Sequence, residues 1–169
     1  ADERLRFLLL DLRHRFGALR VQRDEIRGLE DLGEPFGRTI DAADAVAGQR
    51  IRRIVLFETG RLAPAVPDGL LSPEAPTWSV YVGEPRREIV EMTIKIPAGV
   101  KLDSAPAPIK YEDDVVAIDA GFALDGDTLR YHRALELRAP YVAPEKFASF
   151  RERMSALRRL EADGVALFD

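Results

Sequence analysis

The sequence predicts a mainly β fold, an antiparallel β-sandwich with a helix near each end of the chain. Three observations support this prediction. Apolar and polar residues alternate in many short runs, turn residues separate these runs, and helical spacing of apolar residues occurs only near the two termini. Strands do not alternate with helices, as they would around a parallel sheet. We therefore expect a single domain over residues 1–169.

Composition limits the class of protein. The 169 residues are 46% hydrophobic and 32% charged, which is ordinary for a globular domain, and the formal net charge of −4 argues against a nucleic-acid partner. The absence of cysteine excludes disulfides, thiolate metal sites and thiol catalysis. No apolar run approaches the roughly 20 residues that span a bilayer. No cofactor is indicated.

A helix is expected over residues 2–16, where five apolar residues fall on one stripe and Gly17 follows as a stop. The sandwich is expected over residues 19–139, interrupted by an irregular excursion over 59–77 that contains four prolines. Its strands are predicted at about 19–28, 38–46, 51–58, 78–82, 87–96, 109–111, 115–124 and 129–138.

A hairpin is predicted at Asp125-Gly126, because a tight turn between two alternating runs requires a residue with positive φ. In the strand that follows, Tyr131 and Arg133 share one face with three leucines, and His132 lies on the opposite, polar face. Pro144 then begins a helix over 143–163, followed by a terminal strand over 164–168. The apolar stripe of this helix consists of Phe147, Phe150, Met154, Leu157 and Leu160.

The segment IKIPAGVKLDSAPAP, residues 94–108, is either a ligand loop or a corner at which the chain changes direction. Pro97 cannot donate a ladder hydrogen bond, Gly99 permits a reversal, and Pro106 and Pro108 keep the next segment extended. We therefore interpret the segment as a corner.

Catalytic chemistry is weakly represented. The two histidines, His14 and His132, are interpreted as surface residues, and they lie too far apart in the sequence to indicate a metal site. No serine lies in a G-x-S-x-G elbow. The acidic residues 30–34 and 112–114 are expected to cap and solvate turns. The arginines of the last helix alternate with Glu145, Glu152 and Glu161 and predict a solvated face. No catalytic residue is assigned.

Binding candidates are limited to two aromatic residues. Trp78 and Tyr81 follow the proline-rich excursion and are the best candidates for a binding surface. A single tryptophan in a sandwich usually packs inside, so we expect Trp78 to lie in the core.

Several segments in this order resemble the C-terminal region of large bacterial transglutaminase-like proteins. They are GLEDLGEPF, IKIPAG with its later proline pair, DTLRYHRALEL, VAPEKF and the terminal VAL. The resemblance spans roughly Leu5 to Leu167. It implies a β-sandwich accessory domain of unknown function in an exported, periplasmic or envelope-associated protein. In that family the catalytic cysteine, histidine and aspartate belong to a separate core, and this chain has no cysteine to match.

We therefore expect a non-catalytic accessory domain that packs on or positions a transglutaminase-like core, or another protein or peptide partner. The alternative is a free-standing module that binds a glycan or a peptide through Trp78, Tyr81 and the proline-rich segment. A carboxylate-dependent hydrolase is the third hypothesis. Because a sandwich has edge strands, a dimer is also compatible with the sequence.

Overall fold

The computed structural model describes residues 20–28, 37–43, 48–57, 59, 71, 76–96 and 98–168. Its contacts divide the chain into two compact units, Ala1–Gln49 and Arg50–Asp169. The helix expected over 2–16 and most of the excursion expected over 59–77 lie outside the described residues, so both stay predictions.

The first unit contains an antiparallel pair of strands, β1 (Arg20–Arg27) and β2 (Gly37–Ala43). Gly28 follows β1 with φ 74°, a backbone conformation that glycine adopts without strain. On the exposed surface of β1, Arg23 forms an ion pair with Glu25. Two strands were predicted in these regions, and the observed strands begin and end within a few residues of the predicted limits.

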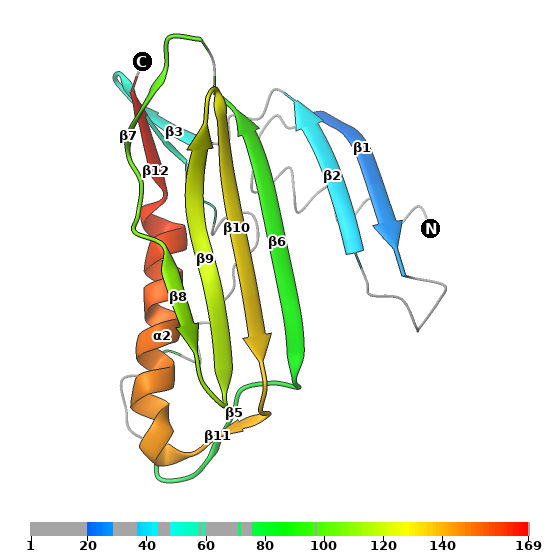
Figure 1. Cartoon of the computed structure of the whole chain (residues 1–169), viewed down its shortest axis with the longest axis vertical. Helices are drawn as coiled ribbons and strands as arrows, with labels where there is room; N and C mark the ends of the chain where they lie inside the picture. The colour runs from blue at the N-terminus through cyan, green and yellow to red at the C-terminus, as the bar shows by residue number, and fades with distance from the viewer. Residues whose placement is uncertain are drawn as a thin grey trace. The chain divides into compact units, whose positions relative to one another are not determined.

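The second unit is built on a four-stranded antiparallel sheet with the order β6-β10-β9-β8 (Figure 1). The strands are β6 (Arg86–Lys95), β8 (Ile109–Glu112), β9 (Val116–Asp125) and β10 (Thr128–Leu137). Asp125 pairs with Thr128, so the two-residue turn consists of Gly126 and Asp127, and Gly126 has φ 60°. The predicted hairpin and the antiparallel β class are therefore confirmed.

The two faces of this sheet differ as the alternation predicts. Leu129, Tyr131 and Leu135 are buried on the inner face, whereas Arg130 and His132 are exposed on the outer face. On β6 the inner Val90 and Met92 are half-buried and the outer Glu91 is exposed. The inner face therefore supplies the core of the unit.

A second sheet has the order β3-β4-β12-β7. Its strands are β3 (Gly48–Ile51), β4 (Ile54–Phe57), β7 (Lys101–Ser104) and β12 (Val165–Phe168). One strand was predicted over 51–58, and β4 lies within these limits, but the turn at residues 52–53 and the separate strand β3 before it were not predicted. The chain reverses at Arg52 and Arg53, with φ 58° at Arg52, and neither residue is a turn former.

The two sheets meet in a buried cluster made of Ile96, Leu129, Val165 and Leu167. Leu129 belongs to β10, and Val165 and Leu167 belong to β12, so the sheets contact through their apolar faces. This cluster covers only one end of the four-stranded sheet.

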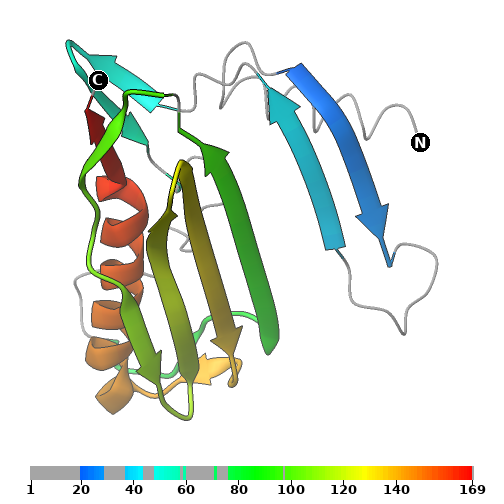
Figure 2. The same ribbon diagram turned by 45° about the horizontal axis from the view of Figure 1, so that its top comes forward.

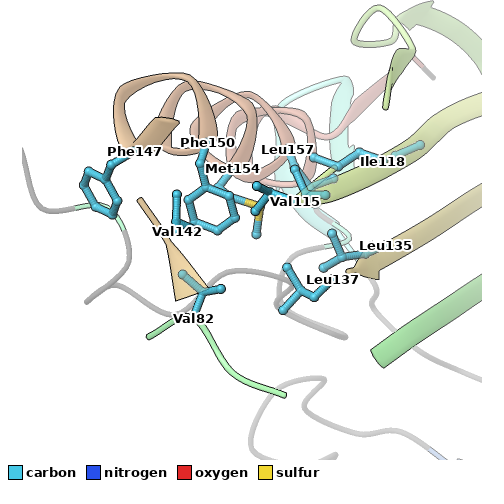
Figure 3. Close-up of a cluster of buried hydrophobic side chains, with 12 residues drawn as sticks. Val82, Val115, Ile118, Leu135, Leu137, Val142, Phe147, Phe150, Met154 and Leu157 are labelled. Carbon is cyan, nitrogen blue, oxygen red and sulfur yellow. The ribbon is translucent and has the colours of Figure 1, made fainter. Parts of the chain in front are cut away.

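Helix α2 (Pro144–Asp163) covers the other part of the inner face and lies closest to β8 and β9 (Figures 1 and 2). Pro144 stands in its first turn, and the Gly164 N–H donates to the Leu160 carbonyl oxygen at 3.3 Å. The five residues of the predicted stripe are all buried. Figure 3 shows Phe150, Met154 and Leu157 pointing from α2 into the buried cluster, with Phe147 at its far end. In the part of the chain that the structure describes, no helix is both long and apolar enough to cross a membrane.

Candidate binding site

Two tyrosines stand side by side on the surface of a small two-stranded sheet. This sheet consists of β5 (Val80–Tyr81) and β11 (Tyr141–Val142), in which Tyr81 pairs directly with Tyr141. Tyr81 is 52% exposed and Tyr141 is 58% exposed. Their ring centroids are 5.5 Å apart with an interplanar angle of 57°, a favourable tilted arrangement. We call these two residues the tyrosine pair.

The core holds the tyrosine pair in place from beneath. Successive side chains of a strand point to opposite faces, so Val82 and Val142 point inward while the tyrosines point outward. Both valines belong to the main buried cluster and face the residues of α2 (Figure 3). The Val82 N–H also donates to the Pro140 carbonyl oxygen at 2.9 Å. The exposed rings therefore stand on a firmly packed support.

A carboxylate lies beside the pair. The Tyr81 hydroxyl donates a hydrogen bond to Glu84 Oε1 at 2.9 Å. This hydrogen bond is the main reason why the pKa of Tyr81 lies above its ordinary value, with burial of the ring next. Gly83 has φ 114° and approaches the Arg86 guanidinium so closely that a Cβ there would lie 2.6 Å from Nη1. The surface thus offers two aromatic faces, an acceptor and a nearby cation.

Trp78 does not lie in the core. Its side chain is 83% exposed, so the prediction that it packs inside was wrong. The residue lies in a bend before β5, where strand alternation no longer sets its direction. Among the ring contacts of the described residues, Trp78 makes none with the tyrosine pair. Tyr141 was missed, although its place between Pro140 and Pro144 marks a surface corner.

The corner interpreted from residues 94–108 borders a groove of about 510 Å³. Gly99 has φ 92° and reverses the chain between β6 and β7, as expected, whereas Pro97 lies outside the described residues. The turn of the β9–β10 hairpin forms the opposite wall, and Lys101 and Asp127 lie at the groove. Asp127 is already paired, since Lys95 Nζ donates to its Oδ1 at 2.9 Å.

The acidic turn at residues 112–114 caps the backbone, as predicted. Asp113 Oδ1 accepts hydrogen bonds from the N–H groups of Val115 and Val116, each at 2.7 Å. Burial raises the pKa of Asp113, but the hydrogen bonds from Tyr111, Val116 and Val115 together bring it below its ordinary value. Asp114 forms an ion pair with Lys146. The acidic residues 30–34 lie outside the described residues.

Glu161 is buried, so the prediction that it belongs to the solvated face of the last helix was wrong. It is only 3% exposed, and its Oε1 accepts hydrogen bonds from Tyr131 at 2.9 Å and from Arg133 Nη1 at 2.5 Å. Arg133 is 2% exposed and also approaches Glu88 at 3.5 Å. These groups join α2 to β10 through a charged network inside the core.

His132 lies on the outer face of the sheet, as predicted, and its side chain is 53% exposed. Its Nε2 is 3.0 Å from Asp119 Oδ1, and this hydrogen bond is the main reason why the pKa of Asp119 lies below its ordinary value. His14 lies outside the described residues. Within the described ranges, no three His, Asp or Glu side chains form a group that could hold a metal ion.

Comparisons with known proteins point to one family. No curated protein matches the chain. The crystal structure of a "putative protease" from Parabacteroides distasonis matches 71% of this chain with a TM-score of 0.54 and 17% sequence identity. The match covers 24% of that protein, so the chain spans about a quarter of its length, and the likeness concerns the fold alone. Residues 74–167 match DUF3858, described as a domain of unknown function with a solved structure. The chain therefore belongs to the DUF3858 family.

Proposed function

We propose that this chain is a non-catalytic accessory domain, a β-sandwich that packs on or positions a transglutaminase-like core or another protein or peptide partner. The observation that carries the proposal is the tyrosine pair, which is exposed at the surface but supported by the core. Tyrosine supplies large contact area at a small cost in side-chain entropy and is enriched in protein interfaces.

Two further facts support an accessory role. The structurally similar protein is about four times as long as the part that this chain matches. The resemblance to transglutaminase-like proteins assigns the catalytic cysteine to a separate core, and this chain contains no cysteine. The same resemblance supports a periplasmic or envelope location, which cell fractionation with an antibody to the chain would test.

The first experiment measures the size of the native polypeptide by immunoblotting an extract of its source. A band far above 18.9 kDa is expected, because the proposal places this domain in a longer protein. A band near 18.9 kDa would contradict attachment to a core and leave only a separate partner.

The second experiment uses the transglutaminase-like core found in that longer polypeptide, produced as a separate protein. Calorimetric titration with this chain should detect binding, and the double variant Tyr81→Ala/Tyr141→Ala should weaken it by about tenfold or more, as aromatic anchors do. Phe168→Ala is the matched control, because Phe168 is 42% exposed and belongs to β12, in the sheet β3-β4-β12-β7, and not to the sheet that holds the tyrosine pair. Equal binding by both variants would overturn the role of the tyrosine pair.

A second candidate function is favoured by the exposure of Trp78. An exposed aromatic ring can stack on a sugar or pack on a peptide, so the chain would then be a glycan- or peptide-binding module. Trp78 is the single tryptophan, and its fluorescence therefore reports directly on this surface. Binding to members of a glycan or peptide panel should shift the emission and reduce quenching by acrylamide. Unchanged emission across the panel would contradict this function.

A further inference from the structure

Strand β6 forms one edge of the four-stranded sheet. It pairs with β10 along all ten residues, and no strand of the described residues pairs with its other side. An edge strand leaves a row of backbone N–H and C=O groups available to another chain. Figure 1 shows β6 as a long, regular strand at that edge of the sheet.

The outer row of β6 contains an exposed apolar residue between two opposite charges. Ile89 is 59% exposed, Arg87 lies two residues before it and Glu91 lies two residues after it. Neither Arg87 nor Glu91 forms an ion pair with a described residue. Proteins commonly protect a sheet edge with charged side chains. Here a positive and a negative side chain lie at equal distances from Ile89, so two antiparallel copies of the strand can place each charge opposite the other sign.

This pattern fits a second copy of the same strand. In an antiparallel pair centred on Ile89, the two isoleucines face each other, and Arg87 of each copy lies opposite Glu91 of the other. Residues directly opposite each other in such a pair have Cβ atoms about 4.5–5.5 Å apart, close enough for both ion pairs. We propose that the edge of β6 is a self-association surface on which a second copy of this chain pairs antiparallel about Ile89.

The neighbouring registers do not have this complementarity. Centring the pair on Val90 places Ile89 opposite Glu91 and leaves both charges without an opposite charge. Centring it on Glu91 places two glutamates together and Arg87 opposite Lys95, and like charges opposite each other are destabilising. Among registers that keep both buried faces on the same side, the one centred on Ile89 alone forms two ion pairs around an apolar contact.

The rest of the strand is compatible with this register. On β10, Glu136 lies opposite Arg87 and already accepts a hydrogen bond from Arg138 at 3.3 Å. On the inner row, Glu88 is engaged by Arg86 at 2.7 Å, so its charge stays compensated when it faces Val90 of the other copy. Each copy contributes seven residues, 86–92. A contact of this length buries less surface than a stable interface does, so the fraction of dimer should depend on protein concentration.

The test measures the mass of the full chain by sedimentation equilibrium from about 10 µM to about 1 mM, the range in which a small interface is populated. The unchanged chain should show a monomer–dimer equilibrium. Arg87→Glu and Glu91→Arg should each weaken dimerisation by about tenfold or more, because each variant places two like-charge pairs in its own dimer. Glu152→Arg is the control, since Glu152 is exposed on α2 and away from β6.

Two further samples test the register itself. An equimolar mixture of Arg87→Glu with Glu91→Arg should dimerise like the unchanged chain, because one variant is then acidic and the other basic at both positions. The double variant Arg87→Glu/Glu91→Arg should also regain the dimer. Monomers at every concentration of the unchanged chain, or no recovery in the mixture, would overturn the proposal. Thermal unfolding of each variant separates loss of pairing from loss of folding.

Discussion

The molecule contains the same hydrogen bond at two depths. Tyr131 donates to Glu161 inside the core, and Tyr81 donates to Glu84 at the surface, each at 2.9 Å. Tyr131 is 1% exposed, whereas Tyr81 is 52% exposed. The local chemistry is equal, so the difference in environment decides what each pair contributes.

The buried pair fixes two elements to each other. Its carboxylate comes from the last turn of α2 and its hydroxyl from β10, and Arg133 adds a buried charge whose closest opposite charge is Glu161. The surface pair connects residues three positions apart in the sequence and orients a ring that is still open to solvent. The same contact therefore contributes to stability in the core and remains available for recognition at the surface.

The largest effect is expected from removing the buried charge. Glu161→Gln keeps the shape of the side chain but leaves the Arg133 guanidinium without its closest opposite charge, which lies at 2.5 Å. We expect the free energy of unfolding to fall by about 3–5 kcal/mol, as when one partner of a buried ion pair is lost. Urea unfolding followed by circular dichroism measures the change. Glu84→Gln is the matched surface control, and an equal loss in both variants would contradict the comparison.

A smaller effect is expected from removing the buried hydroxyl. Tyr131→Phe deletes the donor to Glu161 but leaves the hydrogen bond from Arg133 in place. The loss should be about 1.5–3 kcal/mol, the usual range for one hydrogen bond to a charged group. The same urea titration measures it. A variant as stable as the unchanged chain would mean that the Tyr131 hydroxyl contributes no net stability.

Alkaline pH should separate the two tyrosines. Burial, followed by the charge and hydrogen bond of Glu161, raises the pKa of Tyr131 above its ordinary value of 10.0. The folded chain therefore holds this proton more tightly than the unfolded chain does. The stability that results is complete below about pH 10 and is lost as the pH rises through the higher pKa of the folded state.

Urea midpoints measured at about pH 8 and about pH 11 test this expectation. Tyr131→Phe should reduce the alkaline loss of stability strongly, whereas Tyr81→Phe should reduce it less, because an exposed hydrogen bond rather than burial is the main cause that raises the pKa of Tyr81. The reverse result would assign the alkaline transition to the surface pair.

The sequence predicted one half of the buried network. Alternation along β10 is a local property, so it correctly placed Tyr131 and Arg133 on the inner face. Glu161 was assigned to the solvated face because it is charged. Its position, four residues after Leu157, nevertheless places it beside the apolar stripe of the helix. A buried arginine requires an opposite charge close to it, and Glu161 beside the apolar stripe of the helix could have been identified as a candidate partner.

The features of the surface were harder to predict from the sequence. The direction of Trp78 depends on a bend, and the meeting of Tyr81 with Tyr141 joins residues 60 positions apart through a two-residue strand pair. The turn at Arg52-Arg53 has neither glycine, proline nor asparagine to mark it. These features arise from tertiary pairing, which a local pattern does not encode.

The smallest effect on stability is expected at the surface pair. Tyr81→Phe removes the hydroxyl that donates to Glu84, but water can replace both partners because the ring is half exposed. The urea midpoint should therefore stay within the scatter that surface substitutions usually show. The aromatic ring remains in Tyr81→Phe, so binding to the transglutaminase-like core should also persist. The double variant Tyr81→Ala/Tyr141→Ala should weaken that binding. Loss of binding in Tyr81→Phe would instead assign recognition to the hydroxyl and its carboxylate partner.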